Sequence, residues 1–269
     1  MPPASTFPTV VHPFDSPTPH ACAYETAKRL ESQPELSYSV FEFRMRSSFL
    51  GFGFSSLVKD VEDISAFVKY LRSIGKEKVV LIGHSTGCQD IMEYIDPAHD
   101  GLSPVEGYIL QGPVSDRGAI SMEMGESKLD ESIEAAKNTI ATGKGYERMP
   151  LEHLPASFQG TPISVFRWHA LGAVDGEDNY FSPDLPDDVA AGFWKRIDKP
   201  ILILHSGQDE FVPKSVDKDA LVKHWTTLCR PGIASELSGT IPGGNHRVEE
   251  LDAEQWLAET VVRFLQTVS

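Results

Sequence analysis

The chain has 269 residues, of which 41% are hydrophobic and 23% are charged, an ordinary globular composition. This length is enough for one large domain with an insertion and short for two independent domains. The formal net charge of −15 disfavours binding to nucleic-acid phosphates or to anionic lipid headgroups, so we expect neither a nucleic acid nor a membrane as a partner.

The three cysteines, Cys22, Cys88 and Cys229, form no CxxC pair and have no metal-ligand spacing. Reduced thiols in a reducing compartment are therefore expected, and no metal site. The first residues lack a basic segment followed by an apolar core, and no apolar run approaches the roughly 18 residues of a membrane span. We therefore expect a cytoplasmic protein.

Short apolar segments alternate with helical patterns along the chain, which predicts a mostly parallel sheet with helices on both faces. The segment at 38–45 is predicted to be a strand, and a one-sided helix follows it, because apolar residues recur there at intervals of three and four: Leu57, Val61, Ile64, Val68 and Leu71. Further strands are predicted at 78–82, 106–110, 201–205 and around 236–241, and a final helix at about 252–267.

The longest interruption of this alternation lies between the strand at 106–110 and the strand at 201–205. It contains a polar helical pattern at 127–140 and a segment rich in Pro and Asp at 175–188. A gap of this length is rarely without structure. We therefore predict a largely helical lid over 116–195, and a core made of residues 1–115 and 196–269.

The segment from Gly83 to Gly87 has the pattern Gly-x-Ser-x-Gly, with Ser85 at its centre. It follows the apolar strand at 78–82 directly and opens a predicted helix. This order of strand, serine and helix is the nucleophile elbow of the α/β-hydrolase fold, which exposes the serine hydroxyl at the carboxyl edge of the sheet. We therefore predict Ser85 as a nucleophile and the backbone N–H of Thr86 as an oxyanion donor.

A serine nucleophile needs a base and an acid that orients the base, and this fold places them in the chain order Ser, Asp or Glu, His. Asp209 follows the predicted strand at 201–205, and His246 lies in a loop between the last strand and the final helix. The predicted catalytic residues are therefore Ser85, Asp209 and His246. No phosphate loop, dinucleotide fingerprint or zinc motif is present, so we expect no cofactor.

Three longer motifs resemble the fungal DUF1749 family of α/β hydrolases: GHSTGCQD at 83–90, EDNYFSPDL at 177–185 and SGQDEFVP at 206–213. The resemblance extends from about residue 38 to the C-terminus. It implies the same triad of Ser85, Asp209 and His246. Because the family includes intracellular esterases that open fusarinine-type siderophores, it also implies a hydroxamate siderophore ester as a candidate substrate.

The front of the chain departs from the family pattern, because no Gly-Gly loop follows its early strand. We expect the sheet to be shortened at this end. The second oxyanion donor would then come from residues 12–16, where Pro13 has no N–H and the Asp15 carboxylate would repel the oxyanion. We therefore predict Phe14 as this donor.

The predicted reaction is hydrolysis of a small-molecule carboxylic ester through an acyl-enzyme. His84 adjoins the nucleophile, and Trp168, His169 and Tyr180 lie in the inserted segment, so these four are candidates for contacts with the substrate. Two alternatives stay open: a catalytically idle ligand-binding protein of the same fold, and an acyltransferase that uses the same triad.

Overall fold

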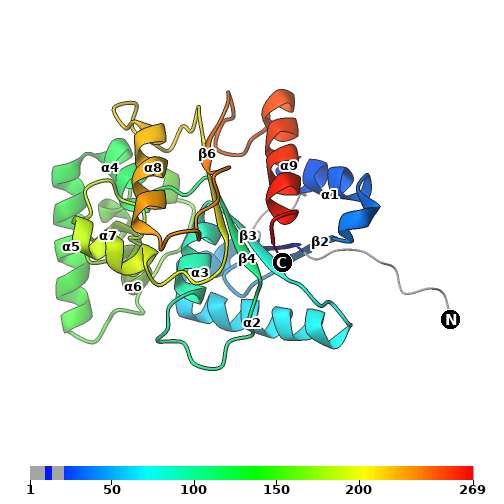
Figure 1. Cartoon of the computed structure of the whole chain (residues 1–269). Helices are drawn as coiled ribbons and strands as arrows, with labels where there is room; N and C mark the ends of the chain where they lie inside the picture. Colours follow the sequence, from blue (N-terminus) through cyan, green and yellow to red (C-terminus); the bar gives the residue numbers. More distant parts are fainter. Residues whose placement is uncertain (1–9, 14–20, 269) are drawn as a thin grey trace.

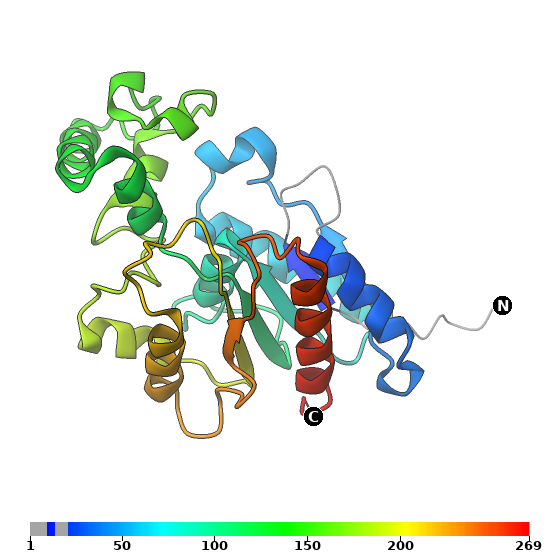
Figure 2. The same ribbon diagram turned by 90° about the horizontal axis from the view of Figure 1, so that it is seen from above.

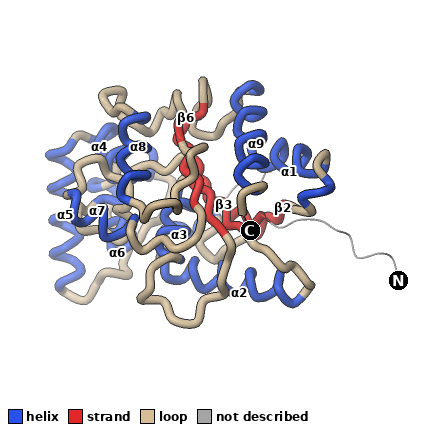
Figure 3. Tube along the Cα trace, viewed as in Figure 1, coloured by secondary structure: helices blue, strands red, loops and turns tan. Residues whose placement is uncertain are grey.

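A parallel sheet lies at the centre of the chain in a computed structural model, which describes residues 10–13 and 21–268 (Figures 1 and 3). In the described part the sheet has six strands in the order β2-β1-β3-β4-β5-β6. The strands are β1 (Val10–Pro13), β2 (Val40–Phe43), β3 (Val80–His84), β4 (Gly107–Gln111), β5 (Ile201–Ser206) and β6 (Gly239–Ile241).

Strands β3, β4 and β5 are buried on both faces, as expected for apolar runs in a parallel sheet. Successive side chains alternate between the two faces. Val80 and Ile82 point into the hydrophobic cluster under α9 (Leu251–Leu265), whereas Leu81 points into the cluster under α2 (Leu57–Ser73) and α3 (Thr86–Tyr94). The sheet therefore separates two cores.

Helices α1 (Ala21–Glu31) and α9 lie on one face of the sheet (Figure 1), and α2, α3, α7 (Asp187–Trp194) and α8 (Lys218–Leu228) lie on the other. The apolar residues that predicted α2 are all buried in its contact with the sheet: Leu57, Val61, Ile64, Val68 and Leu71. Short 3₁₀ helices connect these elements: η1 (Pro34–Leu36), η2 (Phe49–Gly53), η3 (Leu151–His153) and η4 (Ala156–Phe158).

A helical insertion lies to one side of the sheet, where Figure 2 shows it in green at the upper left. It contains α4 (Asp116–Met124), α5 (Glu126–Ala141) and α6 (Val165–Gly172), which share a separate hydrophobic cluster around Trp168. Helix α7 differs, because Trp194 packs in the cluster against the sheet. The insertion is thus largely helical, as predicted, but the end of the stretch at 116–195 packs with the sheet.

The predicted strands and the final helix are present, with shifts of one to a few residues at their ends. The early strand is β1, and it lies between β2 and β3. In the described part of the chain, no helix is both long enough and apolar enough to cross a bilayer.

Candidate active site

Ser85 lies in the turn between β3 and α3, with a φ of 53° and a ψ of −123° that non-glycine residues rarely adopt. Its N–H donates to the Gln111 carbonyl at 3.1 Å, and its own carbonyl accepts the N–H of Cys88 at 2.8 Å. A Cβ built at Gly83 would lie 2.1 Å from the Gly87 carbonyl oxygen, so strand and helix can approach only through a glycine. The turn therefore has the strained geometry of a nucleophile elbow.

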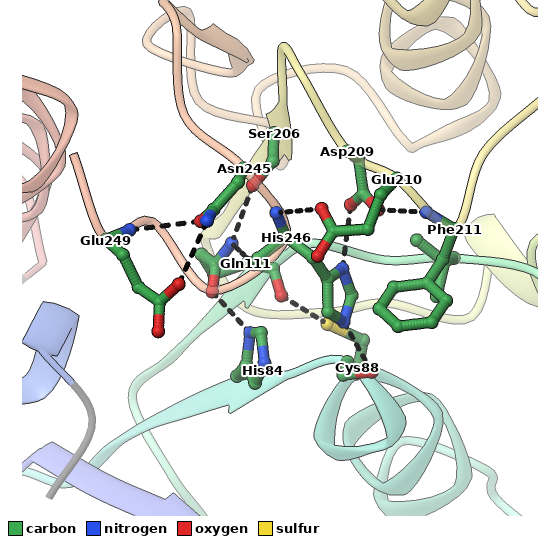
Figure 4. Close-up of polar contacts among 12 residues, drawn as sticks. His84, Cys88, Gln111, Ser206, Asp209, Glu210, Phe211, Asn245, His246 and Glu249 are labelled. Atoms are coloured by element: carbon green, nitrogen blue, oxygen red, sulfur yellow. Dashed lines mark hydrogen bonds and ion pairs between the residues drawn. The ribbon is translucent and has the colours of Figure 1, made fainter. Parts of the chain in front are cut away.

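Ser85, His246 and Asp209 are joined by hydrogen bonds, although they are far apart in the sequence. Figure 4 shows the contact between His246 and Asp209. The Oγ of Ser85 lies 2.9 Å from Nε2 of His246, and Nδ1 of His246 lies 2.8 Å from Oδ2 of Asp209. The other oxygen of Asp209 accepts the N–H of Phe211 at 3.0 Å. Because a carboxylate only accepts, His246 carries its proton on Nδ1 and presents a lone pair to the serine.

The imidazole of His246 is held from several sides. The Phe211 ring meets it edge-on, with ring centroids 4.8 Å apart. Gly112 has a φ of +61°, and a Cβ built there would lie 3.5 Å from the imidazole, so this strand end also approaches the ring closely. The Glu210 carboxylate accepts the backbone N–H of His246 at 2.9 Å. Glu210 therefore positions the histidine loop, and Asp209 is the acid that contacts the ring.

Gln111 and His84 lie beside this hydrogen-bonded chain. Oε1 of Gln111 is 2.5 Å from Nδ1 of His84, and the His84 ring lies 4.8 Å from the His246 ring. His84 was predicted to contact substrate, but it is 9% exposed and packs between the amide and the second imidazole. His84 is the last residue of β3, and its ring lies beside the proposed base, so a substrate contact by His84 stays a prediction.

Trp168 and Tyr180, two further predicted substrate contacts, are buried, and a contact of either with substrate stays a prediction. Trp168 is fully buried in the insertion, where its indole N–H donates to Ser132 at 2.7 Å. Tyr180 is 4% exposed in the cluster against the sheet, and its hydroxyl donates to Glu93 at 2.6 Å. Both side chains contribute to hydrophobic clusters, because each ring buries a large apolar area while its N–H or O–H group makes a hydrogen bond.

His169 lines a cavity of about 570 Å³ between the insertion and the start of α2. At the edge of this cavity, the Gly53 carbonyl accepts the N–H of Ser164 at 2.8 Å, which joins the segment before α2 to the insertion. Ser85, Asp209 and His246 are not among the described residues that line the cavity. A substrate contact by His169 stays a prediction.

Thr86 is the first residue of α3, which places its backbone N–H beside Ser85 at the helix N-terminus. Phe14, predicted as the second oxyanion donor, lies outside the described residues, and that prediction stays untested.

Among the described residues, no group of three or more His, Cys, Asp or Glu side chains could hold a metal ion. Cys88 and Cys229 are free and buried, and burial raises the pKa of the Cys229 thiol to about 11.

A second buried polar group adjoins α3 and was not predicted from the sequence. One guanidinium nitrogen of Arg167 contacts both oxygens of Asp178, at 2.7 and 2.8 Å, and both side chains are buried. Asp90 and Asp116 are close enough for their negative charges to favour the Arg167 cation, and burial raises the pKa of both carboxyls. A single arginine in the apolar segment at 163–171 was the available signal.

The parallel sheet, the strained serine after β3 and the chain order Ser, Asp, His define an α/β hydrolase. A family model described as "Protein of unknown function (DUF1749)" matches residues 20–266. The chain therefore belongs to this family, as its three motifs predicted.

The relatives with a named activity are hydrolases. The chain is 34% identical over 251 residues to a UPF0613 protein of Schizosaccharomyces pombe, covering 87% of this chain and 79% of that protein. It is 27% identical over 289 residues to the fusarinine C esterase sidJ of Aspergillus fumigatus, covering 86% and 81%. The structure of the siderophore hydrolase EstB from Aspergillus fumigatus has a TM-score of 0.76 at 25% identity, covering 98% and 91%. These likenesses support an esterase of the α/β-hydrolase fold.

Proposed function

We propose that this chain is a serine-dependent carboxylic ester hydrolase in which Ser85, His246 and Asp209 form the catalytic triad. The observation that carries the proposal is the unbroken chain of hydrogen bonds from Ser85 Oγ through His246 to Asp209, at 2.9 and 2.8 Å, on a strained elbow. A catalytically idle member of the fold would have no need for this geometry, because the strained serine costs about 1–3 kcal/mol of stability.

The proposed reaction has two halves, formation and hydrolysis of an acyl-enzyme, and the triad acts in both. His246 Nε2 removes the proton as Ser85 Oγ attacks the ester carbonyl, and Asp209 stabilises the imidazolium that forms. The N–H of Thr86 stabilises the oxyanion. His246 then returns the proton to the leaving alcohol, which leaves an acyl-enzyme. Water attacks this ester with the same histidine as base and releases the carboxylic acid.

We further propose an ester of a hydroxamate siderophore as the substrate. The support is the family membership together with two relatives, one named a fusarinine C esterase and one a siderophore hydrolase. The expectation is a higher kcat/KM for fusarinine-type esters than for p-nitrophenyl esters of similar chain length. Brisk hydrolysis of the simple esters without turnover of any siderophore ester would remove this substrate class.

A fluorophosphonate probe followed by peptide mapping tests the nucleophile, because only an activated serine reacts with it. We expect one labelled peptide that contains Ser85, and loss of both labelling and esterase activity, by at least about 10³-fold, in Ser85→Ala. Ser65→Ala, at a buried serine in α2, is the control for unspecific labelling. A folded wild-type protein that is not labelled would favour the idle ligand-binding alternative.

A further inference from the structure

The side chain of Gln111 contacts the ends of β3 and β5 and the loop that carries His246. It is the last residue of β4, between the serine strand β3 and the acid strand β5, and it is 1% exposed. Its Nε2 donates to Ser206 Oγ at 3.1 Å and to the His246 carbonyl at 3.4 Å, and its backbone carbonyl accepts the N–H of Ser85. One residue thus contacts the backbone of the nucleophile and the backbone of the base. Figure 4 shows Gln111 between His84, Ser206 and His246.

The orientation of this amide follows from its partners. A backbone carbonyl only accepts, so the amide nitrogen must be the atom that faces His246. Oε1 then faces His84 at 2.5 Å, and because Oε1 is also only an acceptor, His84 must carry a proton on Nδ1. His84 therefore donates its Nδ1 proton to the Gln111 amide, with its ring 4.8 Å from that of His246.

We propose that Gln111 is a positioning residue of the hydrolase: its amide fixes the loop that carries His246 and holds a proton on Nδ1 of the neighbouring His84. This inference rests on the proposed function for its kinetic consequence, although the position of the His84 proton does not depend on it. The side chain has no contact with a reacting atom. Its effect would come through the distance between Ser85 Oγ and His246 Nε2, and a displacement of about 1 Å between reacting groups costs up to about 10²-fold in rate.

The test replaces Gln111 with methionine, which has similar length and no comparable hydrogen-bonding groups. We expect kcat to fall roughly 10- to 100-fold, KM to change less than about threefold, and the rate of fluorophosphonate labelling to fall together with kcat. Gln89→Met is the matched control, because Gln89 is also fully buried and adjoins the same elbow, but its amide donates to Val114 and Asp116 instead. Its kcat should change less than about threefold.

A spectroscopic measurement tests the position of this proton in the wild-type protein, whether or not Gln111→Met folds. The ¹⁵N shifts of labelled histidine at pH 8, assigned with a His84→Asn variant, should show that Nδ1 of His84 is protonated. An unprotonated Nδ1 would overturn the amide orientation. If the wild type is labelled and Gln111→Met is labelled equally fast, or if Gln89→Met loses as much activity, the positioning role is wrong. A wild-type protein without labelling or turnover would instead refute the proposed function.

Discussion

Two buried polar networks adjoin helix α3, and they are built on different principles. In the network of Ser85, His246 and Asp209, both ring nitrogens and both carboxylate oxygens have a hydrogen-bond partner. In the network of Arg167, several buried atoms have no hydrogen-bond partner within the described chain, namely Nε of Arg167, Oδ1 of Asp90 and Oε1 of Gln89. The first network is held together by directed hydrogen bonds, and the second by the attraction between the Arg167 cation and the acidic groups around it.

The difference has a physical basis in what each network has to do. Proton transfer needs particular atoms at hydrogen-bond distance, so each atom of the first network has one partner. The second network joins the insertion, which supplies Arg167 and Asp178, to α3, which supplies Asp90. There the Arg167 cation pairs with Asp178, and burial raises the pKa of the neighbouring Asp90 and Asp116, so the charges of the group matter more than a path for a proton. A substitution in the first should affect activity, and one in the second should affect stability.

The largest expected effect is on activity, in Asp209→Asn. An amide at this position favours the wrong tautomer of His246, so kcat should fall by roughly 10⁴-fold. The melting temperature should change little, because shape and burial are kept. Steady-state kinetics and thermal unfolding of the same preparation check this. If Asp209→Asn keeps its activity while Asp178→Asn loses it, the roles of the two networks are exchanged.

Arg167→Met should have the largest effect on stability. It leaves Asp178 buried without its cation, and breaking a buried pair in this way costs about 3–5 kcal/mol. Urea unfolding measures the free energy directly. Arg46→Met is the matched control, because Arg46 pairs with Asp63 at the surface and a pair of that kind contributes at most about 1 kcal/mol. Adding Asp178→Asn to Arg167→Met should restore stability, and equal losses in the two single arginine variants would contradict charge balance.

A smaller effect should appear in the pH dependence of stability. Burial raises the pKa of Asp60 to about 6, and burial together with the nearby Asp178 raises that of Asp116 to about 7. Both start from 3.8, so the folded state binds more protons than the unfolded state between these values. Their contribution to the free energy of unfolding should therefore fall as the pH rises from about 4 to about 7.

The measurement is urea unfolding at several pH values for the wild type and for Asp60→Asn combined with Asp116→Asn. The wild type should lose stability relative to this variant as the pH rises through the window. Equal slopes in the two proteins would show that neither carboxyl takes up its proton on folding.

The smallest effect is expected in Asp90→Asn. Burial and the nearby Asp60 raise the pKa of Asp90 well above its usual range, and its Oδ1 has no hydrogen-bond partner. An asparagine resembles the protonated acid in shape and charge. Stability at pH 7 should therefore change by less than about 1 kcal/mol. A loss as large as that of Arg167→Met, measured by the same urea unfolding, would mean that the ionised carboxylate is required.

The sequence was sufficient where a local pattern determines the geometry. The two glycines around Ser85 and the apolar strand before it predicted the elbow, and chain order located Asp209 and His246. It was insufficient to show that Trp168 and Tyr180 are buried, because sequence alone does not reveal which aromatic side chains of an insertion pack into a hydrophobic cluster. Gln111 was missed, although a polar residue at the end of the apolar strand YILQ was a usable signal.

The contact between helices α1 and α9 has a consequence for folding during synthesis. Arg29 in α1 donates to Glu259 in α9 at 2.7 Å, across a sequence separation of 230 residues. The apolar face of the sheet under these helices is covered only when α9 is present (Figure 1). Because contacts this distant form late, a nascent chain on the ribosome must keep that face open until α9 has emerged, more than 200 residues after α1. We expect stalled chains that lack α9 to be protease-sensitive and to be bound by chaperones.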